Sequence, residues 1–248
     1  MSDERSPGFR STLILAGGRS SRMGQDKSLI EIDGTPMLRR VYDVAAACTR
    51  DVWVVTPWAE RYRAILPSDC CWIHEIAPPE AARFDTAHSG DILTNALSLG
   101  AEEHITDPSG LPALETSVST ENSSLMQGPL VGFAQGLEFL VSQGYAADWV
   151  LLLACDLPRL RAEVLKDWMA ELDTIDADTM AAMPHHSNGW EALCGFYRSA
   201  CLPNLKSFID SGGRSFQRWL RSQPVHLLDV PDTTMMINCN TPEDLENV

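Results

Sequence analysis

A pair of glycines followed by several cations stands near the start of the chain, in the segment LILAGGRSSRMGQDKSL at 13–29. The cations are Arg19, Arg22 and Lys27. Because Gly17 and Gly18 lack a Cβ atom, their backbone can approach a ligand closely and turn N–H groups towards phosphate oxygens. Arginine binds phosphate through paired hydrogen bonds, and lysine adds a compact positive charge. The segment therefore predicts a phosphate-binding loop.

Two better-known phosphate loops do not fit this segment. A Walker A loop, G-x-x-x-x-G-K-[ST], needs a lysine directly after its second glycine, whereas two residues separate Gly24 from Lys27. A Rossmann fingerprint, G-x-G-x-x-G, opens a helix at a tight turn after a strand. The pair Gly17–Gly18 followed next by Gly24 does not have that spacing. An ordinary glycine-rich loop with solvated cations is the alternative to a phosphate site.

A single aspartate closes the most apolar strand that the sequence predicts. The segment WVLLLACDLP at 149–158 carries no charge before Asp156. A charge at the end of a buried strand is costly unless it lies at the edge of the sheet or binds a cation. Since Mg²⁺ favours one or two carboxylates together with substrate phosphates, Asp156 is a candidate metal ligand. A cap for the next helix, ahead of Pro158, is the alternative role.

The elements that position these residues alternate between apolar strands and amphipathic helices. Strands are expected at 12–16, 51–55, 70–76, 149–156, 180–183, 192–197 and 225–228. Helices are expected at 35–48, 58–66, 91–99, 128–141 and 161–172, on both sides of Gly212–Gly213, and from Thr241. In the first helix, Thr35 is the expected N-cap and Pro36 the first helical residue. The alternation predicts a three-layer α/β fold with a mostly parallel central sheet, in which ligands bind beyond the carboxyl ends of the strands.

One domain over residues 1–248 accounts for the length of the chain. Residues 77–127 interrupt the alternation and are rich in Pro, Ser, Thr and Glu, so we interpret them as a poorly patterned insertion. The balance of 19 Lys and Arg against 34 Asp and Glu gives a net charge of −15, which argues against a nucleic-acid partner. No apolar run approaches the roughly 18 residues of a membrane span.

The cysteines and the first residues indicate a compartment. Seven cysteines without a CxxC pair are typical of reduced thiols in a cytosolic protein. The polar start MSDERSPGFR has no apolar segment of a secretory signal. We therefore expect a cytoplasmic protein.

Four segments together resemble a known family. LAGGRSSRMGQDK is similar to the signature LAGGxSxRMGxDK of the molybdenum cofactor guanylyltransferases, or MobA-type proteins, which belong to the nucleotidyltransferases with a Rossmann-like α/β fold. GPLVG at 128–132 resembles the family's GPLAG, and ACDLP at 154–158 resembles its CDxP. NCNTPEDL at 238–245 resembles its N-x-NTPEDL. The resemblance runs from about residue 11 to the last residue, except for 77–127.

The resemblance implies a reaction. It is the transfer of GMP from GTP to molybdopterin-bound molybdenum (Mo-molybdopterin), which forms molybdopterin guanine dinucleotide and pyrophosphate, with Mg²⁺ as cofactor. Molybdenum-insertion proteins and molybdoenzyme chaperones are candidate partners, and neither nucleic acid nor a membrane is expected. The alternatives are a cytidylyltransferase for the same pterin, another nucleotidyltransferase, or a catalytically silent nucleotide-binding scaffold.

The resemblance also implies roles for individual residues. The backbone of Leu15, Ala16 and Gly17 would contact the nucleotide, with Gly18 beside them. Lys27 would contact phosphate, and with Arg22 it would stabilise the transferred phosphoryl group and the leaving pyrophosphate. Asp156 would bind both nucleotide and Mg²⁺.

Some positions depart from the family pattern. The residue after the second strand is often Asn and here is Thr56, and the aspartate near GPLAG is best matched by Glu75, with Asp85 or Asp91 as alternatives. Asn240 is either a ligand of metal or phosphate or a helix cap. The segment of Trp190, Glu191 and 193–197 resembles a family strand beside the second substrate, and is also compatible with a plain core strand. His185–His186 has no third ligand at zinc-like spacing, so we expect a solvent-exposed loop there.

Overall fold

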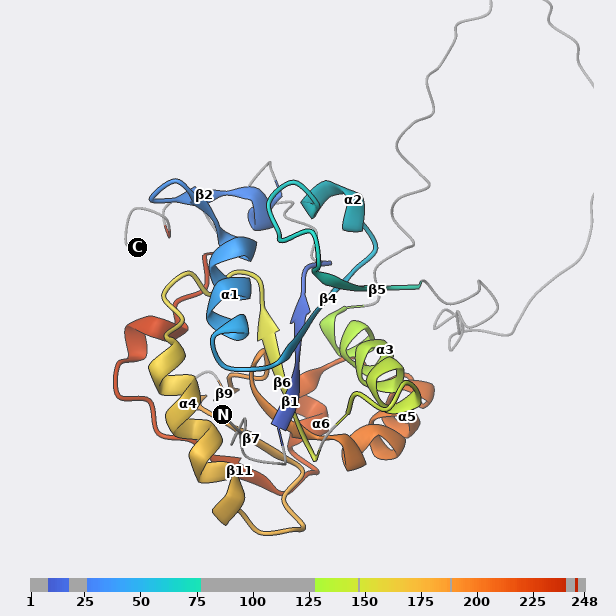
Figure 1. Cartoon of the computed structure of the whole chain (residues 1–248). Coiled ribbons are helices and arrows are strands. Elements are labelled where there is room, and N and C mark those ends of the chain that lie inside the picture. Colours follow the sequence, from blue (N-terminus) through green and yellow to red (C-terminus); the bar gives the residue numbers. More distant parts are fainter. Residues whose placement is uncertain are drawn as a thin grey trace, which may run out of the picture. The chain divides into compact units, whose positions relative to one another are not determined.

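A seven-stranded sheet forms the centre of the computed structural model, which describes residues 9–17, 26–76, 128–146, 148–187, 189–239 and 244 (Figure 1). The strand order is β11-β7-β10-β6-β1-β4-β5. The strands are β1 (Phe9–Leu15), β4 (Asp51–Thr56), β5 (Cys71–His74), β6 (Trp149–Ala154), β7 (Ala181–Met183), β10 (Cys194–Arg198) and β11 (Val225–Leu227). Only β10 runs antiparallel to its neighbours among these seven. The predicted mostly parallel sheet is confirmed.

Helices lie on both faces of this sheet (Figure 1). They are α1 (Met37–Ala46), α2 (Ala59–Tyr62), α3 (Pro129–Ser142), α4 (Ala162–Glu171), α5 (Leu202–Asp210) and α6 (Phe216–Leu220). Short 3₁₀ turns are η1 (Lys27–Leu29), η4 (Leu172–Thr174), η5 (Ser199–Cys201) and η6 (Thr233–Met236). Two small hairpins pair β2 (Glu31–Ile32) with β3 (Thr35–Pro36), and β8 (His185–His186) with β9 (Gly189–Trp190).

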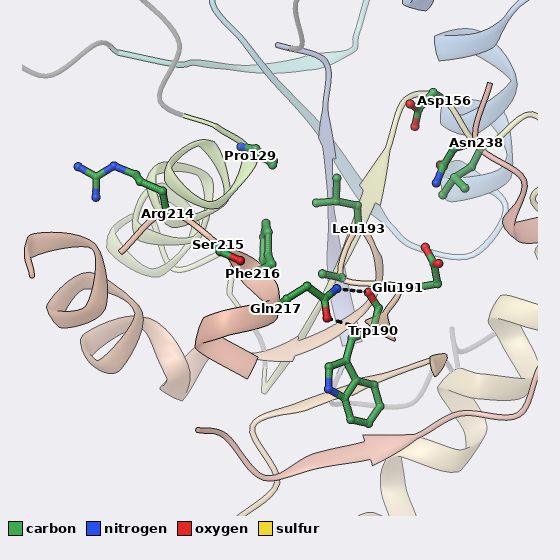
Figure 2. A pocket seen from close by; sticks show the side chains of 12 residues that line it. Pro129, Asp156, Trp190, Glu191, Leu193, Arg214, Ser215, Phe216, Gln217 and Asn238 are labelled. Atoms are coloured by element: carbon green, nitrogen blue, oxygen red, sulfur yellow. Dashed lines mark hydrogen bonds between the residues drawn. The ribbon is translucent and has the colours of Figure 1, made fainter. Parts of the chain in front are cut away.

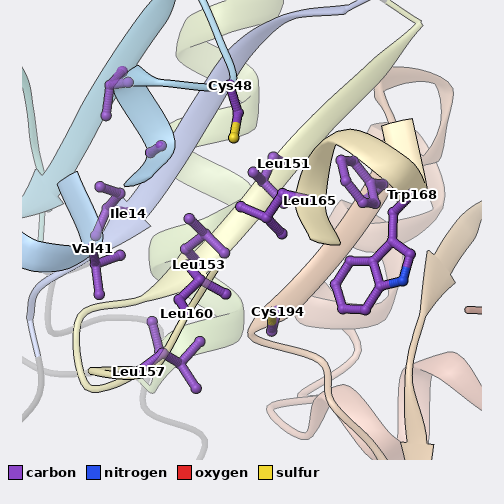
Figure 3. Close-up of a cluster of buried hydrophobic side chains, with 14 of the residues drawn as sticks. Ile14, Val41, Cys48, Leu151, Leu153, Leu157, Leu160, Leu165, Trp168 and Cys194 are labelled. Atoms are coloured by element: carbon purple, nitrogen blue, oxygen red, sulfur yellow. The ribbon is translucent and has the colours of Figure 1, made fainter. Parts of the chain in front are cut away.

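Strand β6 shows why the alternating pattern gives three layers. Its side chains point to the two faces in turn, and all six of its residues are buried. Leu151 and Leu153 belong to one hydrophobic cluster, to which α1 and α4 contribute (Figure 3). Val150 and Leu152 belong to the other cluster, to which α3, α5 and α6 contribute. A strand covered on both faces must be apolar at every position, and the WVLLLA sequence meets that requirement.

The start of α1 differs from the prediction. Thr35 and Pro36 pair with β2 as a short strand, and the helix begins at Met37. The cause is a two-residue turn at Asp33 and Gly34, whose φ angles of 51° and 74° suit a hairpin connection. Pro36 takes the N-cap position without a side-chain cap hydrogen bond. The predicted Thr35 cap is therefore wrong, because the hairpin uses that residue first.

Several further predictions can be placed against the structure. All seven cysteines are free thiols, as predicted. In the part of the chain that is described, no helix is long and apolar enough to cross a membrane. The insertion at 77–127, the helix at 91–99 and the helix opening at Thr241 lie outside the described residues, so they stay predictions.

Candidate functional site

Four of the predicted site residues lie at one edge of the sheet. Gly17 comes two residues after β1, Glu75 directly follows β5, and Asp156 comes two residues after β6, while Thr56 ends β4. These four strands are parallel neighbours, so their carboxyl ends lie at the same edge. That edge is where open α/β sheets bind ligands.

Lys27 and Asp156 form an ion pair at this edge. The Nζ atom of Lys27 lies 3.4 Å from Oδ2 of Asp156, and the two side chains are only 18% and 19% exposed. Burial raises the pKa of Asp156, and the neighbouring ammonium of Lys27 opposes that rise. The pair offers a cation for phosphate and a carboxylate for a metal ion within one short distance.

The segment that carries Lys27 is anchored from both sides. Asp26 caps η1 by accepting a hydrogen bond from the N–H of Ser28 at 3.1 Å. The hydroxyl of Tyr62 donates to the other oxygen of Asp26 at 2.8 Å, and burial raises the pKa of Tyr62, which keeps it a donor. Ser28 lies 3.4 Å from the Cys155 sulfur, beside Asp156. The supporting role of Tyr62 was not predicted, because it depends on packing between distant segments.

Glu75 fills the space beside two motif glycines. A Cβ atom on Gly17 would lie 2.5 Å from Oε2 of Glu75, and one on Gly132 would lie 3.3 Å from its carboxyl group. Burial raises the pKa of Glu75. Both glycines therefore make room for this carboxylate at the sheet edge, where the predicted second acid belongs. Asp85 and Asp91, the alternatives, lie outside the described residues.

Thr56 supports the loop from inside. Its side chain is fully buried, and its hydroxyl donates to the carbonyl of Ala16 at 2.9 Å and accepts from the N–H of Trp58 at 3.1 Å. The buried hydroxyl of Thr56 therefore joins the ends of β1 and β4, and the predicted contact of Thr56 with nucleotide stays a prediction.

The three residues predicted to touch nucleotide through their backbone have different surroundings. Leu15 belongs to β1 and pairs with both β4 and β6. Ala16 donates its N–H to the carbonyl of Val55 at 3.0 Å, and its own carbonyl accepts from Thr56. Gly17 is the last residue described before the loop. Gly18, Arg22 and Asn240 lie outside the described residues, and their roles stay predictions.

A pocket of about 410 Å³ opens beside Asp156 (Figure 2). Its lining combines Asp156 and Leu157 after β6, the first residue of α3, the segment from Trp190 to Leu193, the segment from Arg214 to Gln217 that leads into α6, and Asn238. Trp190 and Glu191 were candidates from the sequence. The contribution of 214–217 was missed, because nothing in that stretch shows that the fold brings it to this edge.

The two adjacent histidines do not form a loop. His185 and His186 make up β8, which pairs with β9. His185 is exposed, as predicted, and packs edge-on against the ring of Trp190 at 4.7 Å. His186 is half-buried, and its Nε2 lies 4.0 Å from Oε1 of Glu191, so the predicted exposure is wrong for this residue. Among the described residues, no group of three or more His, Cys, Asp or Glu could hold a metal ion by itself.

Comparison with known proteins gives one consistent family. The model of the MobA-like NTP transferase domain matches residues 12–90 and 98–226, and so passes through most of the stretch 77–127. A "probable molybdenum cofactor guanylyltransferase" from a Nostoc species is 44% identical over 94% of this chain and 87% of its own length. A protein of the same name from Synechococcus elongatus is 35% identical over 94% of both chains.

A solved structure supports the fold. The molybdopterin-guanine dinucleotide biosynthesis protein A of Archaeoglobus fulgidus superposes with a TM-score of 0.62 over 96% of this chain and 95% of that protein. Its sequence identity is 18%, so the likeness concerns the fold.

Proposed function

The chain belongs to the MobA-like NTP transferase family, and on that premise we propose that it transfers GMP from GTP to Mo-molybdopterin, releasing pyrophosphate. It is a nucleotidyltransferase, as the family match and the names of its relatives indicate. The guanylyl donor and the pterin acceptor are taken from the names of relatives that are 35–44% identical over most of the chain.

The observation that carries the proposal is the Lys27–Asp156 pair at the end of β6. A transferred phosphoryl group spreads negative charge over its oxygens, and a fixed ammonium in a partly buried site stabilises that charge more than water does. The nitrogen of Lys27 is held 3.4 Å from Asp156, next to the 410 Å³ pocket. The pair can therefore receive phosphates at the mouth of a site large enough for a second substrate.

The carboxylate of Asp156 suits Mg²⁺ as a ligand. Asp156 is a carboxylate in a half-buried position whose pKa is raised by burial, and a divalent cation would favour its ionised form. Mg²⁺ commonly takes one or two protein carboxylates and completes its shell with phosphates and water. Asp156 would hold the ion, and when bound the ion would supply charge neutralisation for the nucleotide phosphates.

The protein's own residues then act by positioning. A phosphate acceptor is already ionised at neutral pH, so the attack on the α-phosphorus needs no protein nucleophile or general base. Lys27 orients and neutralises phosphate oxygens, and the predicted contact of Arg22 would add a second cation. Holding acceptor and donor in line accounts for much of the rate increase expected here.

Glu75 favours guanine as the base. Guanine presents two adjacent N–H donors on one edge, its ring N–H and its amino group, whereas the equivalent edge of cytosine has a single donor group. The carboxylate of Glu75 lies against Gly17, where the resemblance expects nucleotide. A carboxylate accepts two such donors at once, so GTP is preferred over CTP in this proposal.

The remaining parts of the proposal concern the location of the protein in the cell and its partners. We include a cytoplasmic location and, as candidate partners, molybdenum-insertion proteins and molybdoenzyme chaperones. Neither nucleic acid nor a membrane belongs to the reaction. The net charge of −15 supports the exclusion of a polyanionic partner.

The decisive experiment measures pyrophosphate release. Purified protein is mixed with Mg²⁺, Mo-molybdopterin and either GTP or CTP. Release that needs the acceptor and is faster with GTP supports the proposal. Faster release with CTP would identify a cytidylyltransferase, and GTP binding without release would identify a silent scaffold.

A further inference from the structure

The pocket beside Asp156 contains a second carboxylate, that of Glu191. In the described part of the chain, no donor is hydrogen-bonded to the side chain of Glu191, and Nε2 of the His186 ring lies 4.0 Å from its Oε1. The Glu191 side chain is only 26% exposed. Since a half-buried carboxylate loses hydration without gaining hydrogen bonds, such a group is suited to a ligand that brings N–H donors.

Hydrogen bonds hold the backbone that carries Glu191. The side-chain amide of Gln217 accepts from the N–H of Trp190 at 3.0 Å and donates to the carbonyl of Trp190 at 2.6 Å. Glu191 itself donates its N–H to Pro184 at 2.9 Å and accepts from the N–H of Cys194 at 2.9 Å. The backbone from which the Glu191 side chain extends is therefore fixed in place, which limits the positions that its carboxylate can take and lowers the entropic cost of binding a ligand.

The neighbouring cation Arg214 does not pair with the Glu191 carboxylate, so a ligand with neutral N–H groups can donate to it. Burial raises the pKa of Glu191, His186 lowers it, and Asp156 raises it further. The other charged residue in the lining, Arg214, donates to the carbonyls of Ile209 and Gly213. Figure 2 shows its guanidinium on the opposite side of the pocket from Glu191. Arginine therefore does not neutralise Glu191 in this structure.

The rest of the pocket suits a flat ring. Leu193 and Phe216 both line it, so an aromatic face would meet apolar side chains (Figure 2). The reacting phosphate of an acceptor must lie near Asp156 and Lys27. Its ring system would then extend along the pocket towards Glu191, which lines the same cavity.

We propose that Glu191 is the specificity residue for the acceptor, and that its carboxylate accepts the ring N–H and the 2-amino group of the pterin. This inference rests on the proposed function, since it assumes a pterin acceptor. The two pterin donors are adjacent on one edge and match the two oxygens of a carboxylate, as in other bidentate pairs. Gln217 is a positioning residue that holds the segment before Glu191.

The same edge occurs in guanine, so the test must separate acceptor from nucleotide. The variant Glu191→Gln keeps the shape but places an amide N–H₂ against a donor of the ligand. We expect the KM for Mo-molybdopterin to rise about tenfold to hundredfold, with the KM for GTP within about twofold of the wild-type value. Equilibrium binding of Mo-molybdopterin without GTP should weaken by the same factor.

Controls keep the result specific. Glu171→Gln changes another glutamate paired with a histidine, His226 at 2.7 Å, on a different part of the surface, and it should leave both KM values unchanged. Gln217→Ala should raise the KM for Mo-molybdopterin with kcat and the KM for GTP retained. If Glu191→Gln does not unfold cooperatively, Glu191→Asp tests the same contact, because it keeps the charge and withdraws it by one methylene.

The outcomes are distinct. Unchanged affinity for Mo-molybdopterin in a folded Glu191 variant overturns the inference, and so does a loss confined to GTP, which would assign this edge to guanine. Absence of pyrophosphate release by the wild-type protein would overturn the proposed function instead. In that case, comparing the equilibrium affinities of the wild-type protein and the Glu191 variant for Mo-molybdopterin still decides whether Glu191 binds the pterin.

Discussion

The ammonium of Lys27 lies 3.4 Å from the carboxylate of Asp156, although the two residues are 129 positions apart in the chain. Lys27 opens a short 3₁₀ turn that Asp26 caps, and Asp156 follows the central strand β6. Neither side chain could reach the other without the parallel pairing of β1 with β6. The ion pair therefore depends on the sheet and places opposite charges where the proposed transfer occurs.

Replacing Asp156 by Asn should remove catalysis and keep the fold. The substitution preserves shape, removes a carboxylate whose burial raises its pKa, and takes away the proposed anchor for Mg²⁺. We expect the rate of Mg²⁺-dependent pyrophosphate release to fall about a hundredfold or more, with cooperative thermal unfolding retained.

The control for this change is Asp43→Asn, which removes an exposed carboxylate paired with Arg39 on α1. It should leave the rate unchanged. Near-normal turnover of Asp156→Asn at saturating Mg²⁺ would rule out the proposed role of Asp156.

The preference for GTP over CTP should depend on Glu75. In the wild-type protein we expect kcat/KM to be higher for GTP, because the Glu75 carboxylate can accept both donors of the guanine edge. Glu75→Gln should lower kcat/KM for GTP about tenfold or more and change that for CTP much less. Steady-state kinetics with both nucleotides at fixed Mo-molybdopterin measure this, and equal losses for the two nucleotides would contradict it.

Much of the fold could be predicted from local sequence. Strands such as WVLLLA were found because a strand buried on both faces must be apolar at every position. The start of α1 was misplaced because the turn at Asp33–Gly34 continues into a hairpin that takes up Thr35. The two signals overlap in sequence, and only the pairing with β2 decides between them.

The site was predictable where a residue ends a strand. Asp156 and Glu75 follow β6 and β5, so topology alone brings them to one edge. Contacts between distant segments were not predictable: the buried hydroxyl of Thr56 contacts Ala16, and Gln217 contacts Trp190, but neither contact has a local signature. The half-buried position of His186 likewise depends on the hairpin it forms.

A stability prediction concerns Gly195, in the strand that leads away from the pocket. A Cβ atom there would lie 2.6 Å from the Cβ of Met183 and 2.9 Å from the carbonyl oxygen of Ala182. The backbone of β7 cannot shift as easily as the end of a flexible side chain. Gly195→Ala should therefore lower the free energy of unfolding by about 1–3 kcal/mol. Chemical denaturation measures it.

The matched control is Gly17→Ala. Its added Cβ meets the end of the Glu75 side chain, which can rotate away, so the loss of stability should be smaller than for Gly195→Ala. A larger loss at Gly17 than at Gly195 would show that the Glu75 carboxylate is held more firmly than the β7 backbone.

The stability of the nucleotide-free protein should depend on pH through Glu75. Burial raises the pKa of this side chain above its unfolded value of about 4.3, so the native state binds the proton more tightly than the unfolded chain does. The contribution of Glu75 to unfolding free energy therefore falls as pH rises through the interval between the unfolded and the folded pKa, and stays low above it. Glu75→Gln removes this loss, so the variant should be more stable than the wild-type protein at pH 8.

The advantage of Glu75→Gln should shrink as pH falls and vanish near the unfolded pKa, where the native glutamate is already neutral. Thermal unfolding of both proteins across this pH range measures the difference, which isolates Glu75 from the other buried carboxylates. Glu60→Gln, at an exposed position of α2 beside Arg63, should show no such trend. A stability difference between Glu75→Gln and wild type that stays constant with pH would mean that burial does not penalise the charge of Glu75. That result would argue against Glu75 as the carboxylate that binds the N–H donors of a purine.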